Sequence, residues 1–186
     1  MLNPKRFIRE KIAKHKKSLS RETVDSLSQK IGNRLIQIEL FQQAKCIALY
    51  CAIENEVQTS ELINEWHTEK KIALPVVSGE NLHFYAFSEK ENPAKDSFGI
   101  PEPVTDELIP PDRIDLFIVP GIAFDYDCNR MGRGKGYYDR YLSGIDKPVI
   151  GLCFDFQLFE HIPCEAHDKK MTVVITENIT VSQHHQ

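Results

Sequence analysis

The chain has 186 residues, of which 41% are hydrophobic and 27% charged, and a formal net charge of −4. That much apolar material can bury one core, so we expect a single domain over residues 1–186, without a signal peptide or a membrane span. The net charge is unevenly distributed, at +6 over residues 1–22, +3 over residues 130–140 and −13 over the rest. Two basic segments in an acidic chain favour a focused anion site. They argue against an RNA-binding groove, since such a groove needs a long positive track.

Two helices are predicted at the start of the chain. The first covers residues 4–18, where Ile8 and Ile12 recur at i, i+4 among cations. The second opens at Ser20, a residue type that suits an N-cap, and its apolar stripe continues to about residue 41. Both helices therefore have one face to bury against other elements.

From residue 46 onward the pattern changes to short apolar runs separated by polar segments, which indicates buried strands alternating with helices. We predict strands at 46–50, 72–77, 82–87, 115–121, 149–154 and 172–176, and helices at 59–70 and 137–142. The segment 82–87 alternates apolar and polar residues, as an edge or antiparallel strand does. The Pro-rich segment 89–113 is predicted to be a weakly structured surface flap. The expected fold is α/β with three layers, α/β/α, in which a mostly parallel sheet has helices on both faces.

The most unusual segment of the chain is RMGRGKGYYDRYL at residues 130–142. Its alternating glycines tolerate positive φ angles, so successive backbone N–H groups can point into one concavity. Arg133 and Lys135 bring two charges to the same place, and a helix beginning at Tyr137 adds further free N–H groups. This pattern predicts a binding site for an anion, in particular for a chain of phosphates.

The segment matches neither of two common phosphate-binding motifs. A P-loop has Ser or Thr after its lysine, whereas Gly136 follows Lys135 here, and a dinucleotide fingerprint has its last glycine where this chain has Tyr137. The residues alone leave two alternatives open. One is a basic turn before a surface helix, and the other is a phosphate-handling enzyme that needs no ATP, such as a sugar-phosphate isomerase or a CoA transferase.

The cysteines and histidines do not indicate a metal or disulfide framework. The chain has five cysteines, an odd number, and no C-x-x-C pair, so we expect free thiols in a reducing cytoplasm. His161 and His167 are six residues apart and fit no common zinc pattern. We expect a monomer that acts on a small molecule, with no nucleic-acid or membrane partner.

The motif GRGKGYYD at 132–139, preceded by VPGIAFD at 119–125, resembles the signature of the 5-formyltetrahydrofolate cyclo-ligase (5,10-methenyltetrahydrofolate synthetase) family. The likeness spans nearly the whole chain, through KRFIR at 5–9, EVQT at 56–59 and HD at 167–168. It implies an ATP- and Mg²⁺-dependent closure of 5-formyltetrahydrofolate to 5,10-methenyltetrahydrofolate, with release of ADP and phosphate.

The resemblance also implies roles for individual residues. Those that would contact ATP are Lys5, Arg6, Arg9, Arg130, Met131, Gly132, Arg133, Gly134, Lys135, Gly136, Tyr137 and Tyr138. Those that would border the folate are Cys51, Glu56, Arg133, Gly134, Lys135, Gly136 and Tyr137. Magnesium would be held by Asp139 and Asp168, and the groups that would take part in catalysis are Arg133, Lys135 and Tyr137.

Overall fold

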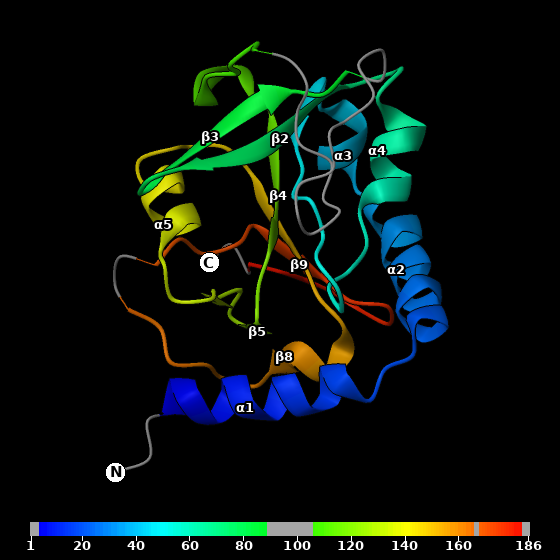
Figure 1. Ribbon diagram of the computed structural model, residues 1–186, viewed down its shortest axis with the longest axis vertical. Coiled ribbons are helices and arrows are strands. Elements are labelled where there is room, and N and C mark those ends of the chain that lie inside the picture. The colour runs from blue at the N-terminus through cyan, green and yellow to red at the C-terminus, as the bar shows by residue number, and fades with distance from the viewer. Residues whose placement is uncertain (1–3, 89–105, 166–167, 184–186) are drawn as a thin grey trace.

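The computed structural model describes residues 4–88, 106–165 and 168–183. A seven-stranded sheet forms the centre of the molecule, with helices on both faces (Figure 1). Across the sheet the strands are β10 (Thr180–Ser182), β9 (Val173–Ile175), β7 (Val149–Leu152), β4 (Leu116–Pro120), β1 (Cys46–Ala48), β2 (Lys71–Ser78) and β3 (Asn81–Ala86). The five inner strands are parallel and the two edge strands antiparallel. The predicted α/β class with a mostly parallel sheet is therefore confirmed.

Four of the inner strands have no exposed residue, whereas β2 is exposed at both of its ends. All residues of β1, β7 and β9 are buried, as expected for parallel strands that are covered by helices on both sides. Successive residues of β4 point to opposite faces: Ile118 joins the apolar cluster beneath the first helices, whereas Phe117 and Val119 join the cluster on the other side. The edge strand β3 alternates buried and partly exposed residues, as its sequence predicts.

The helices α2 (Arg21–Leu35), α3 (Glu39–Gln43) and α4 (Ser60–Trp66) contribute to the first cluster, and α5 (Tyr137–Leu142) contributes to the second. The Ser20 N-cap is confirmed, because its Oγ accepts a hydrogen bond from the Thr23 N–H at 3.1 Å. Helix α5 has the predicted bounds, whereas the helix expected over 59–70 is shorter and ends at Trp66.

The prediction of one continuous helix from Ser20 to about residue 41 is wrong. Helix α2 ends at Leu35, a turn closed by bonds such as Ile38 N–H to Leu35 carbonyl follows, and α3 begins at Glu39. The reason is geometric, because Leu35 and Phe41 are both fully buried. Six residues correspond to about 240° around an α-helix, so an unbroken helix would place these side chains on different faces.

A second sheet was not predicted from the sequence. It has three short strands, β5 (Ala123–Asp125), β6 (Arg130–Met131) and β8 (Leu158–Phe159), in the order β6-β5-β8. Helix α1 (Pro4–Lys17) lies across it at one end of the molecule (Figure 1). Ile8 and Ile12 of α1 are buried against Ala123 and Met131, which fixes the basic helix beside the residues that follow β6.

Two short 3-10 turns complete the described chain, η1 (Pro111–Arg113) and η2 (Asp155–Gln157). Most of the predicted flap, residues 89–105, lies outside the described residues. Its last part is held to the sheet, because Leu108 bridges to Tyr85 of β3 and Ile109 is buried. Within the described ranges, no helix is long and apolar enough to cross a bilayer.

Candidate functional site

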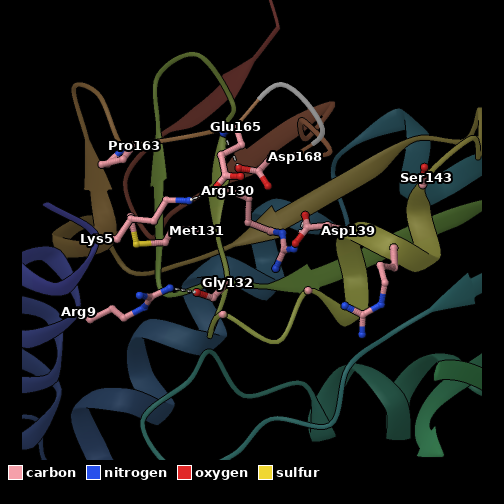
Figure 2. Close-up of a pocket in the computed structure, with 13 residues that line it drawn as sticks. Lys5, Arg9, Arg130, Met131, Gly132, Asp139, Ser143, Pro163, Glu165 and Asp168 are labelled. Atoms are coloured by element: carbon pink, nitrogen blue, oxygen red, sulfur yellow. Dashed lines mark hydrogen bonds and ion pairs between the residues drawn. The ribbon is translucent and has the colours of Figure 1, made fainter. Parts of the chain in front are cut away.

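A cavity of about 440 Å³ lies where α1, the segment after β6 and α5 converge with Pro163, Glu165 and Asp168 (Figure 2). Its lining residues are Lys5, Arg9, Arg130, Met131, Gly132, Gly134, Gly136, Asp139, Arg140, Ser143, Pro163, Glu165 and Asp168. The site is therefore assembled from segments that are far apart in the sequence, and the docking of α1 on the small sheet brings two of its cations to the cavity.

The glycine loop, residues 132–136, forms one wall of this cavity. Gly134 and Gly136 have φ angles of 99° and 67°, a region that L side chains rarely adopt, which confirms the predicted need for glycine. Among the described residues, none accepts a hydrogen bond from the backbone N–H groups of residues 133–138. Such a run of unpaired donors is suited to binding an anion.

Two arginine side chains flank the loop, of which Arg130 is buried and Arg9 partly buried. Arg130, whose side chain is 3% exposed, donates to Asp139 Oδ1 at 2.8 Å and to the Pro120 carbonyl at 3.2 Å. Arg9 donates to the Gly132 carbonyl at 3.3 Å. The Nε–H groups of Arg9 and Arg130 are both buried, and no described residue accepts a hydrogen bond from either. Because an unpaired buried donor is costly, these two groups favour an anionic ligand in the cavity.

The opposite wall carries acidic side chains. Lys5 Nζ lies 2.7 Å from Glu165 Oε1, and this hydrogen bond raises the pKa of Lys5 above its ordinary value. Asp168 Oδ2 accepts from the Glu165 N–H at 2.8 Å. Asp139 and Asp168 thus border the same cavity, and carboxylate oxygens are the donors that Mg²⁺ prefers. These two residues therefore fit the predicted magnesium site.

A different group of acidic residues has a structural explanation. The carboxylates of Asp125 and Asp127 and the ring of His161 lie close enough together to suggest a metal site. However, Asp125 Oδ1 accepts from the backbone N–H groups of Asp127 and Asn129, and Oδ2 accepts from the Ile162 N–H. Asp125 therefore holds the turn between β5 and β6 in place, and we assign it no metal.

A smaller cavity of about 110 Å³ lies beside the same glycine loop. Glu56, Arg133, Lys135, Tyr137 and Tyr138 are among its lining residues. Arg133 Nη2 lies 2.6 Å from Glu56 Oε1, and the Glu56 side chain is 8% exposed whereas that of Arg133 is 59% exposed. Glu56 is thus a buried carboxylate whose cationic partner is free to move into solvent.

The tyrosines differ in their surroundings. The Arg130 guanidinium lies 5.6 Å from the centre of the Tyr138 ring, and burial raises the pKa of Tyr138 well above its ordinary value. The Tyr137 hydroxyl donates to the Gly79 carbonyl at 3.4 Å. Tyr138 therefore remains a neutral, packed ring, whereas Tyr137 spans from the loop to the turn between β2 and β3.

Two residues that the sequence analysis missed line a recess that shares Glu56 and Gly121 with the smaller cavity. Lys16 borders this recess with Glu56 and Gly121, where burial lowers its pKa and the Glu56 charge opposes that shift. Gln157 Nε2 donates to the Gly121 and Ile122 carbonyls at 3.1 and 2.9 Å, which holds the turn after β4. The helical spacing of Lys16, seven residues after Arg9, was a usable signal, whereas Gln157 had none.

The predicted site residues fall into three groups. Those that line the larger cavity are Lys5, Arg9, Arg130, Met131, Gly132, Gly134, Gly136, Asp139 and Asp168, and those that line the smaller one also include Glu56, Arg133, Lys135, Tyr137 and Tyr138. Arg6 and Cys51 line neither cavity. Arg6 pairs with Glu10 on the exposed side of α1 at 2.7 Å, and Cys51 packs against the core, so their ligand contacts stay predictions.

The sequence is similar to one family of known proteins over most of its length. The model of the family described as "5-formyltetrahydrofolate cyclo-ligase family" matches residues 2–177. The 5-formyltetrahydrofolate cyclo-ligase of Mus musculus is 29% identical and covers 96% of this chain and 96% of its own length. That of Haemophilus influenzae is 31% identical over 87% of this chain and 91% of its own.

Solved structures show the same likeness in three dimensions. The 5,10-methenyltetrahydrofolate synthetase of Aquifex aeolicus, solved by NMR, superimposes with a TM-score of 0.88 at 35% identity, covering 99% of this chain and 95% of its own. The corresponding protein of Mycoplasma pneumoniae has a TM-score of 0.77 at 26% identity, covering 95% and 100%.

Proposed function

The chain belongs to the 5-formyltetrahydrofolate cyclo-ligase family, and we propose that it uses Mg·ATP to close 5-formyltetrahydrofolate to 5,10-methenyltetrahydrofolate. One observation carries the ATP part of this proposal. The backbone N–H groups of residues 133–138, for which no described residue is an acceptor, lie between two cavities. One cavity has two arginine Nε–H groups that no described residue pairs, and the other has a buried carboxylate. That arrangement suits a phosphate chain on one side of the loop and a folate on the other.

The chemistry explains why two ligands must meet at one wall. A formamide oxygen is a poor leaving group, and phosphorylation converts it into one that leaves readily. The formyl oxygen attacks the γ-phosphorus of ATP, the bond to ADP breaks, and the carbon then carries a phosphate. N10 of the folate attacks this carbon and loses its proton, the C–O bond breaks with release of phosphate, and the five-membered ring is complete.

Phosphoryl transfer needs positioning and charge stabilisation more than covalent help. Lys5, Arg9 and Arg130 would hold the phosphates in the larger cavity, with the Nε–H groups of both arginines as donors. The loop N–H groups and Lys135 would face the charge that develops on the transferred group. Asp139 and Asp168 would hold Mg²⁺, which neutralises phosphate charge when it is bound.

The folate would occupy the smaller cavity and extend beyond it. Glu56 is suited to accept hydrogen bonds from N–H groups of the pterin ring, since it is a buried carboxylate. The Tyr137 ring lies beside the Lys135 ammonium, 5.9 Å from it, and offers a flat surface for the ring system. Arg133, which is exposed and bordered by glycine, would be the loop cation that reaches both ligands.

The experiment is a spectroscopic assay of the purified protein. Mixed with 5-formyltetrahydrofolate and Mg·ATP, it should develop the near-ultraviolet absorbance of the methenyl product together with one ADP per turnover. Absence of product with ATP present would refute the proposal. Lys135→Ala should weaken ATP use strongly at an unchanged melting temperature. Lys14→Ala, an exposed lysine of α1 outside both cavities, is the matched control and should behave as wild type.

A further inference from the structure

We propose that Arg140 is a positioning residue that fixes the direction of the peptide between Lys135 and Gly136. The proposal rests on the phosphate-binding role of the glycine loop proposed above. In the sequence, Arg140 is one of the four cations of the basic segment 130–140. Its contacts, rather than its charge, distinguish it from its neighbours.

The guanidinium of Arg140 connects two backbone segments. Nη1 donates to the Lys135 carbonyl at 2.8 Å, and Nη2 donates to the Glu80 carbonyl at 2.9 Å. Glu80 lies in the turn that joins β2 to β3. The same guanidinium lies 5.4 Å from the centre of the Tyr137 ring. Arg140 thus ties the glycine loop to a turn of the main sheet, whose own geometry is fixed by the hairpin pairing.

The carbonyl of Lys135 determines where the next N–H points. In a trans peptide the C=O and N–H groups point in opposite directions, so a carbonyl held by Arg140 turns the Gly136 N–H away from the guanidinium. That N–H is one of the donors for which no described residue is an acceptor. Gly136 lines both cavities, so the direction of its N–H decides whether a phosphate meets a donor there.

Glycine makes this peptide prone to reversal. Gly136 has φ 67° and ψ 15°, close to the third residue of a type II turn, and rotation of the preceding peptide converts such a turn to type I. A glycine adopts both conformations at little cost. The reversed peptide would present the Lys135 carbonyl oxygen where the N–H was, and an oxygen dipole repels phosphate. A bond to the carbonyl is therefore needed to keep one orientation.

The chain contains a matched control for this contact. Arg34 of α2 also donates to two backbone carbonyls, those of Glu177 and Asn178. It lines neither cavity, and its partners follow β9 on another side of the fold. Arg34→Ala therefore removes the same kind of contact without touching the glycine loop.

The test measures Mg·ATP binding by calorimetry in wild type, Arg140→Ala, Arg140→Lys and Arg34→Ala, with melting temperatures and amide NMR spectra. If the peptide is reversed in about nine-tenths of the Arg140→Ala molecules, this variant should bind ATP about tenfold more weakly. Its Gly136 amide signal should also lose most of its ATP-induced shift. Arg140→Lys keeps the charge but has one ammonium for two carbonyls, so it should recover only part of the affinity. Arg34→Ala should bind ATP as wild type does.

Binding by Arg140→Ala within twofold of wild type would overturn the proposal. So would full recovery in Arg140→Lys, because charge alone would then explain the effect, or an equal loss in Arg34→Ala, because general loosening would then explain it. Failure of wild type itself to bind Mg·ATP would instead refute the proposed function, so the two failures are distinguishable.

Discussion

Replacement of Asp139 by asparagine tests the buried ion pair on which the site is built. Asp139 is 20% exposed and its Oδ1 lies 2.8 Å from Nη2 of Arg130, which is 3% exposed. Among the described residues, no other side chain neutralises the Arg130 charge at this distance. Asp139→Asn therefore leaves a buried cation without its counter-ion.

The size of the effect follows from what remains around Arg130. Breaking a buried pair by removing one partner costs about 3–5 kcal/mol. The asparagine oxygen can still accept one hydrogen bond, and the Pro120 carbonyl and the Tyr138 ring stay in contact with the guanidinium. We therefore expect the lower end, about 3 kcal/mol, which for a chain of this size lowers the melting temperature by about 6–12 °C.

The assay is thermal unfolding of the ligand-free protein, followed by circular dichroism. The double variant Arg130→Met/Asp139→Leu removes both charges, so it should melt near wild type, because apolar residues of similar size often replace a buried pair without loss. A melting temperature of Asp139→Asn within 2 °C of wild type would refute the reasoning, and so would a double variant that is less stable than the single one.

Two further predictions concern stability. Burial raises the pKa of Glu177, so the folded protein holds this proton more tightly than the unfolded chain and loses stability as pH rises through the raised pKa. Glu177→Gln should therefore raise the melting temperature at pH 8, and this gain should shrink toward pH 4.5. A gain that is independent of pH would contradict the assignment. A Cβ added at Gly151 would overlap the Phe124 ring, so Gly151→Ala should cost about 1–3 kcal/mol in urea unfolding. Adding Phe124→Leu should restore most of that loss, and a single variant as stable as wild type would argue against the packing.

The features that the sequence predicted well have local causes. Positive φ at Gly134 and Gly136 uses a freedom that glycine itself supplies, although Gly132 in the same alternation does not adopt it, and the Ser20 cap follows from a side chain and a backbone three residues away. The inner strands follow from apolar runs that only a doubly covered sheet can bury. In each case the structure is decided by residues that lie close together in the sequence.

The features that escaped prediction depend on distant partners. The break at the end of α2 is imposed by the burial of Phe41 against the sheet rather than by any residue in the turn. The strands of the small sheet have two or three residues each, which is too short to show an alternation of apolar and polar residues. The pairing of Glu56 with Arg133 joins residues 77 apart in sequence.

The most direct test of the central claim follows the formyl oxygen. In a single turnover with 5-formyltetrahydrofolate labelled with ¹⁸O at the formyl group and with Mg·ATP, phosphate and methenyl product are quantified together by mass spectrometry and absorbance. The proposed reaction predicts that each phosphate carries one ¹⁸O atom and that phosphate and methenyl product form in equal amounts. Methenyl product accompanied by unlabelled phosphate, or formed without ATP, would contradict transfer of the phosphoryl group to the formyl oxygen.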